Sequence, residues 1–219
     1  MEMLVPEGPQ IGAVLVIPSW WGLTPSFHRY GAALAHAGYR VGLADLFDGE
    51  TATTLAQARS LRARKRKIPC YRTLGASIAA LRHASGQPDR RIGVVGFSMG
   101  GHWAIWLSQR PEYHIGACTV YYAARAGDFH HCQAGVLAHF AGSDEWVSTS
   151  ARRSMERALQ VARCAYCAHD YPGTRHWFAE HDRVEAFDPA AAALALNRDL
   201  HHLRAHLAQE QPPARRRTD

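Results

Sequence analysis

The sequence predicts an α/β fold in which a mostly parallel central sheet carries helices on both faces. Short apolar runs of strand length alternate with segments of helical length, as in parallel strands joined by crossover helices. Glycines and polar residues follow several of these runs, where the carboxyl ends of the strands would lie. The chain has 219 residues and is 47% hydrophobic, which suits one domain with a substantial core.

The expected elements follow one another along the chain. The first helix is rich in small residues and ends at Gly38, which can adopt the left-handed conformation that stops a helix. Two helical stretches are expected between residues 51 and 82, broken at Pro69, and a closing helix spans 190–209. The expected strands are residues 11–17, 40–44, 92–96, 115–121, 135–141 and 164–170.

One domain accounts for residues 1–209. Residues 210–219 contain two prolines and three consecutive arginines, and we expect them to form a flexible basic tail. The sequence shows no internal repeat. A second domain is therefore not needed to explain the chain.

Ser98 lies on a glycine-flanked turn between an expected strand and an expected helix. Gly96 and Gly100 stand two residues before and two after it, so that the chain can turn sharply without Cβ clashes. The turn presents the hydroxyl near a helix N-terminus, where negative charge is favoured. This is the pattern of a nucleophile elbow. The alternative is a glycine-rich turn with an incidental serine.

A serine nucleophile needs a base, and the base needs an orienting carboxylate. Asp144 follows the strand expected at 135–141, and His176 lies in the loop after the strand expected at 164–170. The order Ser, Asp, His is that of the α/β-hydrolases. Asp144 could instead cap the next helix through an Asx turn, and its neighbour Glu145 is the other acid to consider. Position in the expected elements excludes other histidines, namely His130, His131, His169, His201, His202 and His206.

From about Ile11 to His206 the chain resembles the dienelactone hydrolase family of α/β-hydrolases. The resemblance implies an α/β-hydrolase fold and hydrolysis of ester-type bonds. The motifs that carry it are the opening strand and loop at 14–23, the nucleophile turn at 96–101, the acid loop at 141–144 and the histidine loop at 171–179.

The chain departs from the family's pattern at three positions. Family members commonly use cysteine as the nucleophile, where this chain has Ser98. In the archetypal enzyme a glutamate pairs with the resting thiol, and the matching residue here is Ser19. We therefore expect Ser98 to be reactive before substrate binds. Glu180 replaces an arginine that holds the substrate carboxylate in the archetype, so the resemblance implies the chemistry rather than the dienelactone substrate.

The oxyanion hole should be formed by two backbone N–H groups. One belongs to Met99, directly after the nucleophile, and the other to Trp20, in the loop after the first strand. Aromatic side chains are expected to wall the substrate pocket, although ordinary core packing could equally account for each of them. The candidates are Trp21, Tyr122 and Trp177.

The formal net charge is +6, and residues 59–67 contribute six positive charges without an acid. Such a run is often a solvated helix face. It could also steer anionic substrates or bind nucleic acid. The sequence shows no aromatic interleaving to favour nucleic acid, and we expect none as a partner.

Cysteine usage and the N-terminus bear on the compartment. Five cysteines do not form the even set of a secreted disulfide framework. Cys164 and Cys167 have the CxxC spacing, but their setting is an apolar strand, so we interpret them as buried thiols rather than as a metal or redox site. We find no signal peptide or membrane-spanning segment and expect a cytoplasmic protein that does not associate with membranes.

Together, these patterns predict a serine hydrolase that acts on small carboxylic esters, lactones or thioesters through an acyl-enzyme. We expect neither a metal nor an organic cofactor. A small peptidase or amidase of the same fold is one alternative. The other is a catalytically idle hydrolase scaffold that binds a small ligand.

Overall fold

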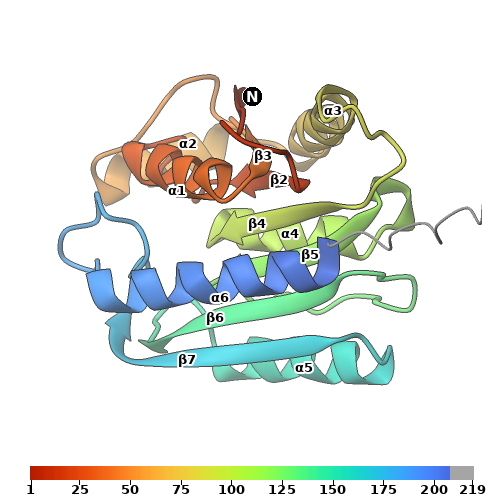
Figure 1. Ribbon diagram of the computed structural model, residues 1–219. Helices are drawn as coiled ribbons and strands as arrows, with labels where there is room; N and C mark the ends of the chain where they lie inside the picture. The colour runs from red at the N-terminus through yellow and green to blue at the C-terminus, as the bar shows by residue number, and fades with distance from the viewer. Residues whose placement is uncertain (208–219) are drawn as a thin grey trace, which may run out of the picture.

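The computed structural model describes residues 1–207. The last two residues of the expected domain and the expected tail at 210–219 lie outside the described residues. Seven strands form one sheet in the order β1-β3-β2-β4-β5-β6-β7 (Figure 1). The strands are β1 (Glu2–Leu4), β2 (Gly12–Ile17), β3 (Tyr39–Leu43), β4 (Ile92–Phe97), β5 (Ile115–Tyr121), β6 (Gly135–Ser143) and β7 (Tyr166–Arg175).

All pairings are parallel except that of β1 with β3. The parallel strands therefore end at one edge of the sheet, on the left in Figure 1, and their loops meet there. Strands β2, β4 and β5 are buried along their whole length, which explains why they are continuous apolar runs.

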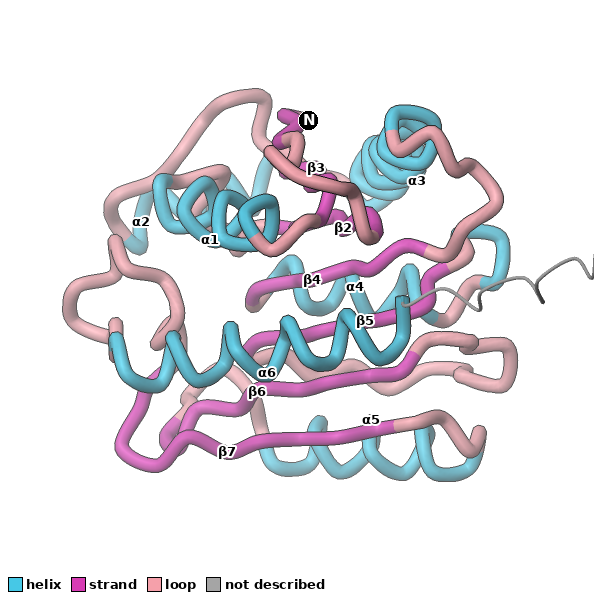
Figure 2. Tube along the Cα trace, in the orientation of Figure 1, coloured by secondary structure: helices cyan, strands magenta, loops and turns pink. Residues whose placement is uncertain are grey.

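Helices cover both faces of the sheet, as predicted. Helices α1 and α6 pack on one face, in front in Figure 2. The remaining helices cover the other face, where the larger hydrophobic cluster lies. The helices are α1 (Pro25–His36), α2 (Leu55–Arg64), α3 (Lys67–Ala84), α4 (Met99–Ser108), α5 (Thr149–Val161), α6 (Pro189–Leu207) and the short 3-10 helix η1 (Pro111–Tyr113).

Several elements differ from the sequence prediction. Strand β7 spans Tyr166–Arg175 where residues 164–170 were expected. The break between the two helical stretches falls at Lys65 and Arg66 rather than at Pro69. Pro69 lies in the first turn of α3, where a backbone N–H has no partner within the helix and proline is tolerated. Strand β1 was not predicted; it is three residues long and pairs only with β3.

The interpretation of Cys164 and Cys167 as buried thiols was wrong. Cys167 is exposed and Cys164 is partly exposed. Strand β7, which contains Cys167, is the last strand of the sheet, so much of it lies at the surface. The apolar pattern correctly indicated a strand, but an edge strand does not bury its whole length.

A buried polar network joins α6 to the sheet and to α1. The carboxylate of Asp199 in α6 accepts a hydrogen bond from Tyr30 at 2.7 Å and one from Tyr121. Its other oxygen lies 2.8 Å from Nε2 of His139, whose Nδ1 contacts the Tyr171 hydroxyl at 2.7 Å. Asp199 and His139 are fully buried, so these contacts replace the water that both side chains lose on folding.

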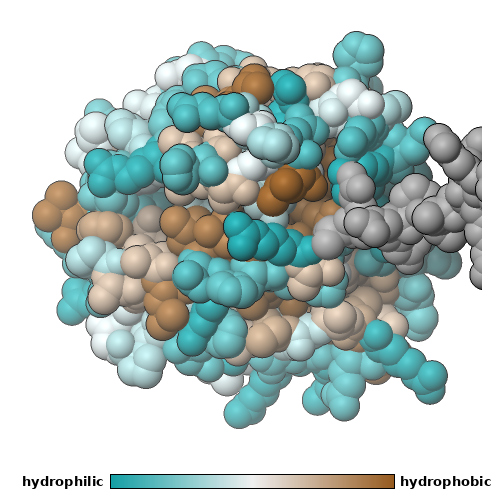
Figure 3. Space-filling view, viewed as in Figure 1, coloured by the Kyte–Doolittle hydropathy of each residue, from teal (hydrophilic) through white to brown (hydrophobic). Residues whose placement is uncertain are grey.

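The face formed by α1 and α6 is largely hydrophilic in Figure 3, and hydrophobic residues lie among the polar ones in small groups. None of the helices in residues 1–207 combines the length and the apolar character that a membrane crossing requires.

Candidate active site

Ser98 occupies a strained turn between β4 and α4. Its φ of 52° and ψ of −111° are rare for a residue with a side chain. A Cβ on Gly96 would lie 2.2 Å from the carbonyl oxygen of Gly100, and one on Gly100 would lie 2.1 Å from that of Ile17. Both flanking positions therefore require glycine for packing, as the nucleophile-elbow interpretation predicts.

The fold brings Ser98, His176 and Asp144 into a chain of hydrogen bonds. Ser98 Oγ lies 2.8 Å from His176 Nε2. His176 Nδ1 lies 2.9 and 2.8 Å from the two carboxylate oxygens of Asp144. The side chains of His176 and Asp144 are 5% and 8% exposed, so the pair is shielded from water. A proton can pass from the serine to the imidazole while the carboxylate holds the ring in one orientation.

Asp144 also forms the Asx turn that was the alternative explanation for it. Its Oδ1 accepts hydrogen bonds from the backbone N–H groups of Trp146 at 2.8 Å and Val147 at 3.0 Å. The two interpretations are compatible, because the same turn holds the carboxylate toward His176. Glu145 is exposed and points to a different hollow.

Two aromatic residues beside the triad have a strained backbone, as Ser98 does. Tyr122, directly after β5, has a φ of 37°, and Trp177, directly after the histidine, has a φ of 71°. Their rings lie 4.8 Å from the His176 ring, measured between centroids. Strain of this kind persists only where the surroundings enforce it and often gathers at functional sites.

A hollow of about 430 Å³ opens over Ser98. The predicted pocket residues Tyr122 and Trp177 line it, as does Trp20. Trp146, Trp103 and Tyr71 line it too and were not predicted. Trp146 is 42% exposed and makes an edge contact with Trp20 at 5.1 Å between ring centroids. Its position two residues after the acid was the one sequence signal that could have identified it.

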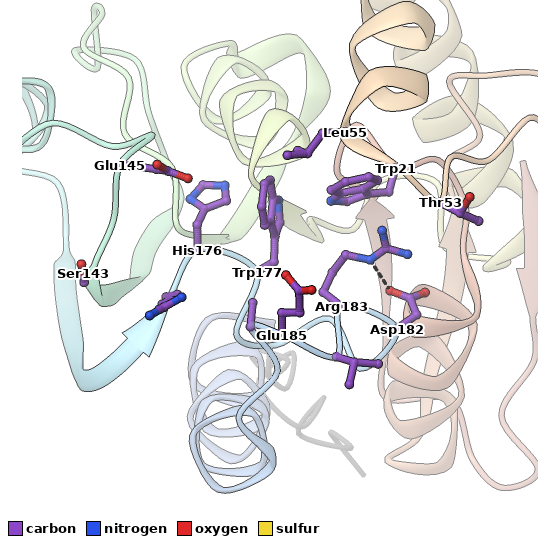
Figure 4. Close-up of a pocket in the computed structure, with 13 residues that line it drawn as sticks. Trp21, Thr53, Leu55, Ser143, Glu145, His176, Trp177, Asp182, Arg183 and Glu185 are labelled. Carbon is purple, nitrogen blue, oxygen red and sulfur yellow. Dashed lines mark hydrogen bonds and ion pairs between the residues drawn. The ribbon is translucent and has the colours of Figure 1, made fainter.

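A second, larger hollow of about 710 Å³ lies on the other side of Trp177 (Figure 4). Trp21, expected in the substrate pocket, lines this hollow, and His176 and Trp177 line both. The guanidinium of Arg183 lies over the Trp21 ring, 4.2 Å from its centroid, and pairs with Asp182 at 3.2 Å. The wall of Trp177 thus separates two hollows with different linings.

The two backbone groups expected in the oxyanion hole are free to bind a substrate oxygen. Within residues 1–207, neither Trp20 nor Met99 donates its backbone N–H to a hydrogen bond. Met99 is the first residue of α4, where backbone N–H groups lack partners within the helix. Trp20 and Met99 both line the hollow that contains Ser98.

The basic run at 59–67 is divided by the fold. Arg62 and Lys67 line the hollow over Ser98, together with Arg125 from the loop after β5. Two others are paired at the surface, Arg64 with Glu50 at 2.8 Å and Lys65 with Asp48 at 2.7 Å. Part of the run is therefore a solvated face, and part of it adds positive charge to the hollow.

Glu180 is fully buried, although a lone acid in a sequence is usually expected to be exposed. It accepts hydrogen bonds from the hydroxyls of Ser19 and Tyr122, both at 2.8 Å. A carboxyl group therefore does lie beside the loop that contains Ser19, but it belongs to Glu180 and not to the residue at position 19. Burial raises the pKa of Glu180 to about 8.

Metal ligands do not gather anywhere in the described part of the chain: residues 1–207 contain no group of three His, Cys, Asp or Glu side chains that could hold an ion.

The parallel sheet, the strained serine turn and the acid and histidine loops at the same sheet edge define an α/β-hydrolase-like protein. A family model, the dienelactone hydrolase family, matches residues 2–207. The chain belongs to this family.

One sequence relative and two solved structures are similar to the chain. The chain is 26% identical over 213 residues to a Bradyrhizobium sp. protein described as a probable 2-oxo-3-(5-oxofuran-2-ylidene)propanoate lactonase, covering 90% of this chain and 85% of that protein. A dienelactone hydrolase structure from Anabaena variabilis ATCC 29413 aligns with a TM-score of 0.65 and 21% identity, over 94% of this chain and 91% of that one. A dienelactone hydrolase-like promiscuous phosphotriesterase from metagenomic libraries aligns with a TM-score of 0.76 and 18% identity, over 93% and 89%.

Proposed function

We propose that this protein is a serine hydrolase that cleaves carboxylic esters, lactones or thioesters through an acyl-enzyme. The observation that carries this proposal is the hydrogen-bonded chain from Ser98 through His176 to Asp144, in a hollow that two free backbone N–H groups also line. Family membership supports hydrolysis, and the Bradyrhizobium relative is described as a lactonase.

In this mechanism Ser98 Oγ attacks the substrate carbonyl while His176 Nε2 takes the hydroxyl proton. The oxyanion is held by the N–H groups of Met99 and Trp20. The C–O or C–S bond then breaks, and His176 gives its proton to the leaving group. Water, deprotonated by His176, hydrolyses the acyl-enzyme and regenerates Ser98. Asp144 keeps the imidazole oriented and stabilises its positive charge throughout.

A fluorophosphonate probe tests the nucleophile. We expect a single covalent adduct on Ser98, because an activated hydroxyl attacks phosphorus as it would a carbonyl carbon. The measurement is mass spectrometry of the labelled peptide, combined with turnover of a short nitrophenyl ester. Ser98→Ala should lose both while its thermal unfolding stays close to that of the wild type. Labelling of another serine would refute the assignment, and absence of both label and turnover would favour the idle-scaffold alternative.

We further propose that the preferred substrate carries a carboxylate. Arg62, Lys67 and Arg125 bring three positive charges to the hollow over Ser98. Positive side chains around a partly desolvated hollow favour anions and speed their arrival. The name of the Bradyrhizobium relative's lactone, a propanoate, contains the same group.

Esters that differ only in a terminal carboxylate test this specificity. We expect the wild type to prefer the carboxylated ester, and Arg62→Gln with Arg125→Gln to reduce that preference by about 10- to 100-fold, the scale of one charge-assisted contact. Added salt should weaken the preference. Arg59→Gln with Arg66→Gln is the matched control, since neither residue lines the hollow. If both double variants changed the ratio equally, the effect would be one of net charge and not of a subsite.

A further inference from the structure

Glu180 is a buried acid close to the triad that the proposed reaction does not use. Its carboxyl group is 0% exposed and bonded at both oxygens. Oε2 accepts from the Ser19 hydroxyl and Oε1 from the Tyr122 hydroxyl, both at 2.8 Å. These partners lie 161 and 58 residues away in the chain. The side chain therefore joins three separate segments, the loop after β2, the end of β5 and the histidine loop.

Each of the two partners leads directly to the reacting groups. Ser19 immediately precedes Trp20, whose free N–H is proposed for the oxyanion hole, and the Ser19 Oγ is 3.5 Å from the backbone nitrogen of Trp21. On the other side, the Tyr122 ring lies 4.8 Å from the His176 ring between centroids. A shift of Glu180 would thus move both the loop that holds the oxyanion donor and the wall that supports the base.

We propose that Glu180 is a positioning residue for acyl transfer, which fixes the Trp20 loop and the aromatic support of His176 in one arrangement. This inference rests on the proposed function. In the archetypal enzyme an arginine at this position holds the substrate carboxylate. Here Glu180 would instead hold the loop and the aromatic ring beside the reacting groups.

The protonation state of Glu180 fits this task. Burial raises its pKa to about 8, against the lowering effect of the Ser19 and Tyr122 hydrogen bonds; Asp182 raises it further and Arg183 lowers it. The carboxyl group is therefore mostly uncharged at pH 7 and does not oppose the negative charge that develops on the substrate. Hydroxyl groups can both donate and accept, so the two hydrogen bonds persist in either protonation state.

Ionisation of Glu180 should be unfavourable for catalysis. Above about pH 8 it places a buried negative charge between the oxyanion loop and Tyr122. That charge repels the oxyanion that forms on the substrate. We therefore expect kcat to fall on the alkaline side with the titration of Glu180.

Variants of Glu180 test the inference on a neutral nitrophenyl ester between pH 6 and 10, with uncatalysed hydrolysis subtracted. Glu180→Ala should lower kcat at pH 7 by about 100-fold, the low end of the loss of one oxyanion donor, while KM changes less than threefold. Glu180→Gln keeps the shape and the hydrogen-bonding capacity, so it should recover kcat to within about tenfold of the wild type and lack the alkaline fall. Glu185→Gln, at an exposed position of the same loop, should keep the wild-type profile.

Ser19→Ala supplies a second, milder test if Glu180→Ala fails to fold. It removes a hydrogen bond that lowers the pKa of Glu180, so the alkaline fall should move to higher pH. The inference is overturned if Glu180→Ala folds and keeps wild-type kcat, or if Glu180→Gln and Ser19→Ala leave the pH profile unchanged. Absence of fluorophosphonate labelling in the wild type would overturn the proposed function and this inference together, whereas a labelled wild type with an unaffected Glu180 series overturns the inference alone.

Discussion

Asp144→Asn is expected to lower kcat by about 10⁴-fold, the scale of the loss of a triad aspartate. In the wild type, His176 Nδ1 lies 2.8 Å from Asp144 Oδ2. An asparagine keeps the shape of the side chain, but its NH₂ group cannot accept a hydrogen bond from the N–H at Nδ1. The ring then loses its orientation and the stabilisation of its charged form. The measurement is kcat on a short ester, with circular dichroism to show that the fold is retained.

Glu145→Gln is the control for this change, because it alters the adjacent acid in the same way. Glu145 is exposed and does not contact His176 in the triad. We expect its kcat to stay within about threefold of the wild type, as for most surface substitutions. A severe loss in Glu145→Gln with a mild one in Asp144→Asn would exchange the roles of the two acids.

Gly100→Ala is expected to be the most destabilising of these changes. The added Cβ would lie 2.1 Å from the carbonyl oxygen of Ile17 and 2.5 Å from that of Pro18. These are backbone atoms at the end of β2, so neither can move aside as a flexible side chain would. We expect a loss above about 4 kcal/mol in the free energy of unfolding, the range reserved for forced packing clashes.

Thermal or denaturant unfolding measures this effect, and Gly8→Ala provides the comparison. A Cβ on Gly8 meets nothing within 4 Å, so that variant should unfold close to the wild type. Equal stability of the two variants would contradict the close approach of α4 to the end of β2 at this turn.

The proximity of the three candidate triad residues could be predicted because each of them follows a local signal in the sequence. Ser98 stands between two glycines at the end of an apolar run, and Asp144 and His176 follow further runs. Parallel strands carry such loops to one sheet edge, so chain position alone brings them together. The geometry now places them within hydrogen-bond distance.

The rest of the site depends on contacts between distant segments, which local patterns do not encode. Glu180 finds its partner Ser19 161 residues away, and a lone acid is far more often exposed than buried. Arg62, Lys67 and Arg125 belong to different elements and meet only at the hollow. Trp21, Tyr122 and Trp177 were expected to line one substrate pocket, but Trp21 lines only the larger hollow, whereas Tyr122 and Trp177 line the hollow over Ser98.

The predicted element boundaries were wrong where one residue type is compatible with two different structures. Pro69 signals a helix break in an interior position and a helix start in a first turn, and only the neighbouring backbone decides between them. The apolar setting of Cys167 predicted a strand correctly, whereas Cys164 lies two residues before that strand. No sequence signal showed that the strand lies at the sheet edge.

The Asp199 network determines the rotational setting of the closing helix. A residue step along an α-helix turns the side chain by about 100°. If α6 docked one residue out of phase, the carboxylate would leave Tyr30, Tyr121 and His139 at once, and each would lose a buried partner. Apolar contacts tolerate small rotations, because one methyl group can replace another. The network therefore distinguishes between docked arrangements that hydrophobic burial alone would leave nearly equivalent.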